Sequence, residues 1–273
     1  MRVWANGRLL GDPSEAAVSA VDHGFTVGDG VFESVKVVDG QPFALTRHLG
    51  RLAASAAGLG LPVLDEERVR SAVAEVLAGE QPHLGRLRIT YTAGPAPMGS
   101  SRGDGPASLV VVTDALTPWA GVASAVVVPW VRNDRGAAAG LKTTSYAENV
   151  IALAYAHDRG AGEAIFANTR DNLCEGTGSN VFYVVDGQLR TPSLASGCLA
   201  GITRDLIIEW CGALECDEQV GVLNTAEEIF LASTTRDIQP VGSIDGRELP
   251  APGPVTAAAM RTWAEREPQD SDP

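Results

Sequence analysis

A short segment, Ala115 to Gly121 with Pro118 and Trp119, divides the 273-residue chain into two stretches that each mix strand and helix signals. A chain of this length can form two modest domains, each with its own core. We therefore predict a mixed α/β (α+β) fold. Its small N-terminal α/β domain covers residues 1–115, an interdomain linker covers 116–123, and a larger C-terminal domain covers 124–273.

The first stretch contains a strand from Val31 to Val38 that ends at the Asp39-Gly40 turn. Because side chains alternate along a strand, Phe32, Ser34 and Lys36 share one side of it. The further elements expected in this stretch are a helix over Thr46–Leu59, a second helix capped by Asp65 with Gly79 just past its end, strands over Leu87–Thr92 and Leu109–Thr113, and a long loop over Gly94–Gly105.

The second stretch begins with a strand at Ala125. After it we expect a helix over Tyr146–Asp158, a strand over Ala164–Phe166, a hairpin over Val181–Leu189 that turns at Asp186-Gly187, a helix over Gly201–Cys211 and a strand over Ile229–Leu231. The tail from Glu265 to Pro273 is polar, and we expect it to be frayed.

Charge and composition exclude several classes of function. The net charge is −13 and no basic stripe is present, which argues against nucleic acid as a partner. No segment approaches the ~20 apolar residues of a membrane span, and no signal-peptide pattern opens the chain, so we expect a cytoplasmic protein without a membrane partner. The four cysteines and four histidines show no metal-ligand spacing. We expect no metal and reduced thiols.

Lysine is rare in this chain, which narrows the search for a reactive amine. Only Lys36 and Lys142 occur among 21 basic residues. The lysine amine forms a Schiff base with a carbonyl, whereas the guanidinium of arginine does not. Lys142 lies in a small-residue break, Gly140 to Thr144, ahead of a helical stretch. Lys36, near a strand end, is more often a solvated residue, and we leave it out of the catalytic set.

Three segments downstream of Lys142 fit an aldehyde cofactor that carries a phosphate. Gly201-Ile202-Thr203-Arg204 opens a helix whose first amides and dipole favour an anion. Ser233-Thr234-Thr235 is a hydroxyl-rich turn after a buried strand. Cys174 to Asn180 places Glu175 among small residues, where a buried carboxylate needs a cationic partner. Taken singly, these are an ordinary helix start, a polar turn and a loop glutamate. Together with Lys142 they match the needs of pyridoxal 5'-phosphate.

At these residues the chain resembles fold-type IV pyridoxal-phosphate enzymes, the class IV aminotransferases with the related aminodeoxychorismate lyases. The resemblance spans nearly the whole chain. It rests on blocks in the family's order: Asp22–Glu33, His48–Leu52, the Lys142 segment, Glu175-Gly176 with Ser179–Phe182, Gly201–Arg204, and Ser233–Thr235 running to Val241. It implies a larger C-terminal cofactor-binding domain with a β-barrel-like core, and a site between the domains that the second subunit of a homodimer completes.

Carried over by position, the resemblance implies a role for each matching residue. Lys142 would form the Schiff base and move the proton, and Leu199 would pack against the cofactor ring. Glu175 would pair with the pyridine nitrogen. The phosphate ligands would be Arg51, Ile202, Thr203 and Thr234. The substrate side would include Phe32, Ser34 and Thr235, with Arg102 of the long loop as a further carboxylate ligand, although a solvated loop arginine is the commoner case.

The reaction stays open between two alternatives. The first is a ping-pong aminotransferase that moves an amino group between an amino acid or amine and a 2-oxo acid through pyridoxamine phosphate. The second is a 4-amino-4-deoxychorismate lyase that gives 4-aminobenzoate and pyruvate, which Ser34 on the pocket strand would suit. Pro97 to Ser100 lacks the carboxylate trap of D-amino-acid aminotransferases. Leu87 to Thr92 lacks the Tyr-x-Arg-Pro signature of branched-chain aminotransferases.

Overall fold

The computed structural model describes residues 1–273, which form two compact units. Unit 1 consists of residues 1–117, 141–146 and 271–273. Unit 2 consists of residues 118–140 and 147–270. Within the stretch predicted as one C-terminal domain, 124–273, residues 141–146 and the last three residues pack with unit 1. None of the helices combines the length and the apolar character that a membrane crossing requires.

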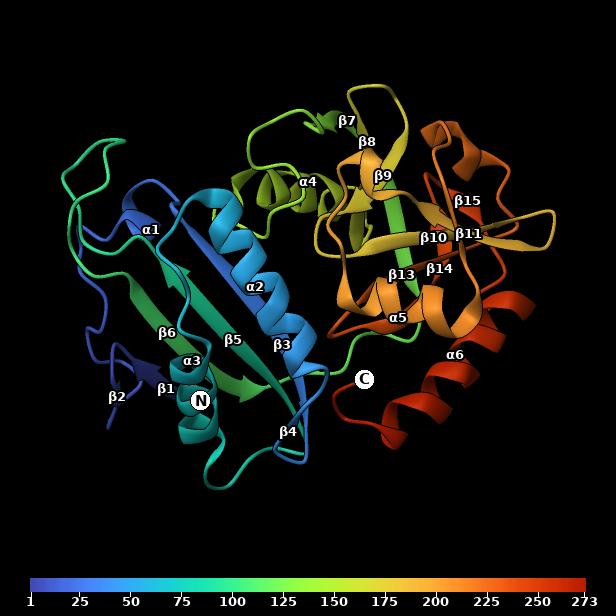
Figure 1. Cartoon of the computed structure of the whole chain (residues 1–273). Coiled ribbons are helices and arrows are strands. Elements are labelled where there is room, and N and C mark those ends of the chain that lie inside the picture. Colours follow the sequence, from blue (N-terminus) through green and yellow to red (C-terminus); the bar gives the residue numbers. More distant parts are fainter. The chain divides into compact units, whose positions relative to one another are not determined.

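Unit 1 is built on a six-stranded antiparallel sheet in the order β2-β1-β6-β5-β3-β4. Figure 1 shows helices α2 and α3 lying over this sheet. The elements are β1 (Arg2–Ala5), β2 (Arg8–Leu9), α1 (His23–Thr26), β3 (Gly30–Val38), β4 (Gln41–Pro42), α2 (Leu45–Leu59), α3 (Glu66–Leu77), β5 (Leu84–Thr92) and β6 (Ser108–Ala115).

The core of unit 1 lies between the sheet and the two helices. From α2 come Leu49, Leu52 and Ala56, and β3 contributes Val31 and Val35, all of which are almost fully buried. Alternation along β3 sends Phe32, Ser34 and Lys36 to the other face of the sheet, as predicted. Asp65 caps α3 by accepting a hydrogen bond from the amide of Arg68, which confirms the predicted cap.

Unit 2 is built on a nine-stranded mixed sheet in the order β12-β11-β10-β13-β14-β7-β8-β9, with β15 paired to β14. Its elements are β7 (Ala123–Arg132), α4 (Ala147–His157), β8 (Glu163–Asn168), β9 (Leu173–Gly176), β10 (Asn180–Val185), β11 (Gln188–Pro192), η1 (Leu194–Ser196), α5 (Ile202–Cys211), β12 (Leu214–Cys216), η2 (Val220–Asn224), β13 (Glu228–Ser233), β14 (Asp237–Ile244), β15 (Arg247–Glu248), α6 (Pro254–Arg266) and η3 (Glu267–Gln269). Figure 1 shows α5 and α6 lying beside the strands of this unit.

Local signals in unit 2 have clear structural outcomes. Asp186 and Gly187 both have positive φ angles, 52° and 70°, as the tight hairpin between β10 and β11 requires, so the predicted turn is confirmed. Helix α4 packs Ala152 and Ala156 against β7 and β8, where small side chains let the helix approach the sheet closely. Helix α5 ends at Cys211, as predicted, and Gly212 follows it in the left-handed conformation.

The prediction of a frayed tail was wrong. Helix α6 continues to Arg266 and is followed by η3, and the last residues bind the first turn of α2 within unit 1. Asp272 accepts hydrogen bonds from the amide of Thr46 at 2.8 Å and from its hydroxyl at 2.5 Å. Ala44, which precedes α2, has no capping side chain, so Asp272 caps this helix from a distant part of the chain.

One buried carboxylate sets the electrostatics of unit 1. Glu33 on β3 is fully buried and accepts hydrogen bonds from Arg51 Nε at 2.8 Å and Arg51 Nη2 at 2.7 Å, and His48 Nδ1 lies 2.7 Å from it. Burial alone would raise the pKa of Glu33, but the charge of Arg51 and the hydrogen bonds from Arg51 and His48 outweigh it and lower the pKa to about 2. The ion pair therefore persists at neutral and mildly acidic pH.

Replacing Glu33 with Gln should destabilise the protein by on the order of 3 kcal/mol at pH 7, because Arg51 loses its buried partner. A carboxyl with a depressed pKa stabilises the folded state above its unfolded pKa, near 4.5, and this stabilisation is lost as pH falls towards about 2. Thermal unfolding of Glu33→Gln should thus depend less steeply on pH between about 5 and 3 than that of the wild type. If the unfolding temperatures of the two proteins changed equally with pH, the ion pair between Glu33 and Arg51 would be contradicted. The control is Glu67→Gln on the exposed side of α3.

Candidate functional site

Lys142 is held in unit 1 as an added backbone segment beside β3. The amide of Phe32 donates to the carbonyl of Lys142 at 3.0 Å, and the amide of Thr144 donates to the carbonyl of Gly30 at 2.8 Å. The amide of Lys142 also lies 3.2 Å from the hydroxyl of Ser55 on α2. Gly140, with φ 75°, allows the chain to enter this segment. The backbone of the lysine is thus fixed by both the sheet and the helix.

The side chain of Lys142 lies over an aromatic ring. Its Nζ is 4.3 Å from the centroid of the Phe32 ring, and the Tyr146 ring packs edge-on against Phe32 at 5.4 Å. The same ring carries the guanidinium of Arg88 at 3.8 Å. The Phe32 ring therefore contacts the amine of Lys142, the ring of Tyr146 and the guanidinium of Arg88. Phe32 lies on the face of the sheet that α2 and α3 do not cover.

Arg88 was not among the residues singled out from the sequence. It lies on β5 directly opposite Ser34 of β3, so its side chain shares the face of Phe32 and Ser34. Its side chain as a whole is exposed, yet the guanidinium over the ring loses enough solvent to lower the pKa of Arg88. The period of two along both strands was the signal that would have identified it.

The other lysine has a different environment. Lys36 is only 4% exposed, and its Nζ lies 5.6 Å from the centroid of the Phe43 ring. The expectation that Lys36 is solvated was therefore wrong, because its side chain is buried and its amine lies over the Phe43 ring. Its contact with Phe43, rather than with Phe32, separates it from the group around Lys142.

Arg51 is oriented by the ion pair with Glu33. Bonding through Nε and Nη2 to the two carboxylate oxygens fixes the plane of the guanidinium. Burial and the positive charges of Arg51 and Lys142 lower the pKa of His48, against the opposing effect of Glu33. A neutral His48 leaves Glu33 to balance Arg51, so the cation keeps one fixed direction on α2.

Arg102 is bound within unit 1. Its guanidinium donates to both carboxylate oxygens of Asp29, at 2.6 and 2.7 Å, and to the carbonyls of Leu59 and Gly60 at the end of α2. It therefore ties the long loop to Asp29 and α2. The role of Arg102 as a ligand of a substrate carboxylate stays a prediction from the sequence.

Glu175 lies on β9 in unit 2, with its side chain 14% exposed. Oε2 accepts a hydrogen bond from the amide of Leu199 at 2.9 Å, and Oε1 lies 3.2 Å from Arg132 Nε. Arg132 also donates to Asn149 Oδ1 and stacks 4.3 Å from the centroid of the Phe166 ring. The structure thus supplies the cationic partner that a buried Glu175 requires.

The first turn of α5 offers backbone donors. Gly201 precedes the helix and provides no capping side chain for the amides of Ile202 and Thr203 in the first turn. A Cβ on Gly201 would lie 2.0 Å from Asn180 Oδ1, so only glycine fits. Asn180 in turn donates to the carbonyl of Leu199 at 2.9 Å. The turn is therefore fixed, and its helix dipole favours an anion.

The third predicted segment is the hairpin turn between β13 and β14. Thr234 and Thr235 lie inside it, and the amide of Arg236 closes it on the carbonyl of Ser233 at 3.1 Å. Trp119 Nε1 donates to the Thr235 hydroxyl at 3.3 Å. The backbone of this turn is therefore also fixed, as a group that binds an anion requires.

These residues fit the cofactor that the sequence analysis named. Unit 1 contains Lys142, Arg51, Phe32 and Ser34, and unit 2 contains Glu175, Leu199, Ile202, Thr203, Thr234 and Thr235. The donor set includes an amine for an aldehyde, one paired cation, helix amides and hydroxyls for a phosphate, and a partly buried carboxylate for a ring nitrogen. The chemistry of this set matches pyridoxal phosphate.

Comparison with known proteins gives a consistent family. The profile of the class IV aminotransferases matches residues 30–244. A putative branched-chain-amino-acid aminotransferase of Methanocaldococcus jannaschii is 33% identical over 258 residues, covering 90% of this chain and 89% of that protein. The D-alanine aminotransferase of Bacillus licheniformis is 33% identical, covering 94% and 93%.

Solved structures agree with this result. The branched-chain amino acid aminotransferase of Escherichia coli has a TM-score of 0.90 at 26% identity, covering 97% of this chain and 94% of that one. A hypothetical aminotransferase of Mycobacterium tuberculosis, solved in its pyridoxal-phosphate-bound form, has a TM-score of 0.86 at 27% identity, covering 97% and 98%. A putative 4-amino-4-deoxychorismate lyase of Legionella pneumophila, at 24% identity, shares the fold.

The predicted fold class, a mixed α/β protein of fold type IV, is confirmed by these neighbours. With the family profile covering most of the chain, and with relatives that span nearly its whole length, the chain belongs to the class IV aminotransferases, a family of pyridoxal-phosphate-dependent transaminases.

Proposed function

We propose that this chain is an aminotransferase that moves an amino group between an amino acid or amine and a 2-oxo acid by a ping-pong mechanism, with Lys142 as its reactive amine. The observation that carries the proposal is the fixed backbone of Lys142 between β3 and α2, with Nζ over Phe32. A surface lysine needs no such anchoring, whereas an amine that must meet one carbon atom repeatedly does.

The cofactor roles follow the chemistry of each group. Pyridoxal phosphate supplies an aldehyde that accepts the amino group and a ring that withdraws electrons from the substrate. Arg51 would bind the phosphate with the amides of Ile202 and Thr203 and the hydroxyl of Thr234. Glu175, fixed by Leu199 and Arg132, would hold a proton on the pyridine nitrogen, and Leu199 would pack against the ring.

Lys142 then has a second role in moving a proton. When it is not bound to the cofactor, Nζ would accept the proton from the substrate Cα and deliver it to C4′, the carbon of the cofactor aldehyde. The Phe32 ring packs against Nζ and excludes water on the side that it covers. The side chains of Phe32 and Ser34, with the Thr235 turn, would contact the substrate.

We also propose that Arg88 binds a substrate carboxylate. It lies beside Lys142 on the Phe32 ring, and its hydrogen-bond contact within the chain is the hydroxyl of Thr90 at 3.4 Å. No carboxylate of the chain pairs with it. A partly desolvated guanidinium without an anion favours an anionic ligand, and both substrate classes of an aminotransferase supply one.

The whole protein is proposed to be a homodimer, with an apolar patch on unit 2 as the contact. Trp130 at the end of β7 packs edge-on against Tyr155 of α4 at 5.4 Å, and Ile151 lies one helical turn before Tyr155. Trp130 is 46% exposed and Ile151 is 55% exposed. Adjacent exposed apolar side chains of this size mark a protein contact. The cytoplasmic location stays a prediction from the sequence.

The proposal for Lys142 is tested with the protein loaded with pyridoxal phosphate. Borohydride reduction followed by peptide mass spectrometry should place the cofactor on Lys142 alone, and Lys142→Arg should lose the label and the visible absorbance. Lys36→Arg is the matched control and should keep both. Single D- or L-amino acids, or an (R)-amine, added without an acceptor should convert the wild-type cofactor to its amino form.

Labelling at Lys36 would refute the assignment of Lys142. Labelling at Lys142 with no conversion by any donor would favour the lyase instead, and aminodeoxychorismate would then be the substrate to test, with pyruvate as the measured product.

Replacing Arg88 with Met should raise the KM for 2-oxo acids and amino acids by about 10-fold or more, because the substrate carboxylate loses a charged donor. The KM for an amine donor without a carboxylate should change little. Arg86→Met, two residues earlier on the same strand face, is the control. Equal effects of Arg88→Met on both substrate types would remove the assigned role.

Replacing Ile151 with Glu should convert the dimer to monomer at micromolar concentration, because a charge would be buried in the apolar contact. Sedimentation equilibrium measures the mass directly. Val63→Glu, at a site in unit 1 that is 97% exposed, should leave the dimer intact. A wild-type monomer, or a dimer that tolerates Ile151→Glu, would exclude this face.

A further inference from the structure

A second buried carboxylate, Glu163, organises the loop that follows Glu175. Glu163 begins β8 and is fully buried. Its oxygens accept hydrogen bonds from the amide of Thr177 at 3.1 Å, from the Thr177 hydroxyl, and from the hydroxyl of Ser179 at 3.0 Å. The amide of Gly176 closes the same loop on the carbonyl of Ser179 at 2.7 Å. One carboxylate therefore fixes the residues immediately after Glu175.

The cation that balances Glu163 comes from the hairpin turn of Thr234 and Thr235. Arg236 Nη2 donates to Glu163 Oε2 at 2.8 Å, and its side chain is 6% exposed. Nη1 donates to Gln239 Oε1 at 2.8 Å. Arg236 directly follows Thr235, and its own amide closes the turn on the carbonyl of Ser233. Anchoring the Arg236 side chain therefore also anchors the backbone of the turn. The ion pair thus joins the turn to the Glu175 loop.

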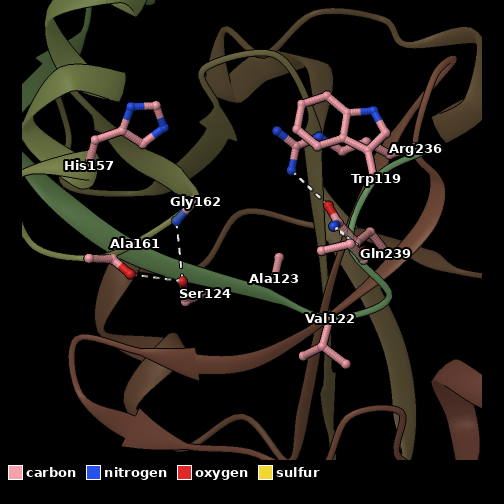
Figure 2. A pocket seen from close by; sticks show the side chains of 11 residues that line it. Trp119, Val122, Ala123, Ser124, His157, Ala161, Gly162, Arg236 and Gln239 are labelled. Atoms are coloured by element: carbon pink, nitrogen blue, oxygen red, sulfur yellow. Dashed lines mark hydrogen bonds between the residues drawn. The ribbon is translucent and has the colours of Figure 1, made fainter. Parts of the chain in front are cut away.

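Trp119 covers the same arginine from the other side. Its ring centroid lies 4.0 Å from the guanidinium of Arg236, and its indole nitrogen donates to Thr235. Figure 2 shows Trp119 beside Arg236, with Gln239 bonded to the guanidinium. A cavity of about 490 Å³ lies next to this group, lined also by Ser124 and His157. The arginine is therefore packed on one side and reachable through a cavity on the other.

The ion pair has a large energetic weight. Burial lowers the pKa of Arg236, and the charge of Glu163 opposes this shift. Because both partners are almost fully removed from solvent, the loss of either would leave a buried charge with no counter-ion. Two loops that carry proposed cofactor ligands thus depend on one charge pair.

We propose that Glu163 and Arg236 are positioning residues that hold the Thr234–Thr235 turn and the Glu175 loop in one fixed arrangement for the cofactor. This inference rests on the cofactor roles proposed above for Thr234 and Glu175. In this role neither residue would touch the cofactor itself. Arg236 acts through the backbone of the turn, and Glu163 acts through Thr177 and Ser179 on one side and through Arg236 on the other.

The test measures binding of pyridoxal phosphate and of pyridoxal, which lacks the phosphate, to the apoprotein. Replacing Arg236 with Ala should raise the dissociation constant of pyridoxal phosphate by about 10-fold, because the turn that would bind the phosphate loses its anchor. The dissociation constant of pyridoxal should change less, because Glu163 still holds the Glu175 loop through Thr177 and Ser179. Amide exchange should accelerate at residues 176–179 and 233–236 of the apoprotein. Arg170→Ala, which removes the ion pair of a half-exposed arginine with Asp134 in unit 2, is the control.

The cavity allows chemical rescue. Methylguanidinium added to Arg236→Ala should restore affinity for pyridoxal phosphate to within about threefold of the wild type, because it replaces the planar pair of donors. Methylammonium carries the charge without this geometry and should restore less. Adding Arg236→Ala to Glu163→Gln should reduce the affinity for pyridoxal phosphate by a smaller factor than Arg236→Ala does in the wild type, since the two residues act as a pair.

Wild-type affinity of Arg236→Ala for pyridoxal phosphate would overturn the inference. If that variant does not fold, Arg236→Lys serves instead, and an affinity equal to the wild type would again overturn it. The proposed function fails separately, when the borohydride label is absent from Lys142 in the wild type, so the two failures are distinguishable.

Discussion

The pairing of residues 141–144 with β3 is the contact on which the site in unit 1 depends. Two backbone hydrogen bonds, from Phe32 to Lys142 and from Thr144 to Gly30, bring a segment that is distant in sequence onto the strand that carries Phe32, Glu33 and Ser34. Backbone bonds at a strand edge fix position and register together. The register decides that Nζ of Lys142 lies over Phe32, because a shift by one residue would turn the lysine to the opposite side.

Three buried carboxylates, Glu33, Glu163 and Glu228, each fix a neighbouring segment by accepting several hydrogen bonds. Glu33 orients Arg51, and Glu163 joins two loops. Glu228 accepts hydrogen bonds from the amides of Val255 and Thr256, and so caps α6 from a neighbouring strand. Each carboxylate has several donors, which offsets the free energy lost when the charge leaves water. The acidic composition therefore serves structure as well as surface charge.

Much of the fold could be predicted because its signals are local. The Asp65 cap, the Asp186-Gly187 turn and the alternation along β3 each depend on residues within one element, and each matches the structure. Helix α6 was missed because its cap, Glu228, lies 27 residues before Val255 in the sequence. The order of the tail could not be predicted for a similar reason, since Thr46, the partner of Asp272, lies 226 residues before it in the sequence.

The candidate site divides along the same line. Lys142, Glu175 and the Gly201 helix start were found from residue type and small neighbours, because reactive groups need particular chemistry and close backbone approach. Arg132 and Arg236 were missed, since an arginine has no local mark that separates a solvated cation from one that pairs with a buried carboxylate. Arg88 was missed because its place on the face of Phe32 depends on the register between β3 and β5. Only pairing of strands and loops shows that difference. Arg88 is opposite Ser34, and Arg132 is beside Glu175.

The cations of the chain also explain how a protein of net charge −13 can bind anions. Long-range attraction is absent, so binding must come from short-range donors. Arg51 is paired with Glu33, whose negative charge offsets part of the field of the guanidinium and whose hydrogen bonds fix its direction. Arg88 has no such carboxylate partner and keeps its full charge for a ligand. A paired cation suits a cofactor phosphate that stays in one place. An unpaired cation suits a substrate carboxylate that must enter and leave in every half-reaction, because no internal partner has to be displaced or regained.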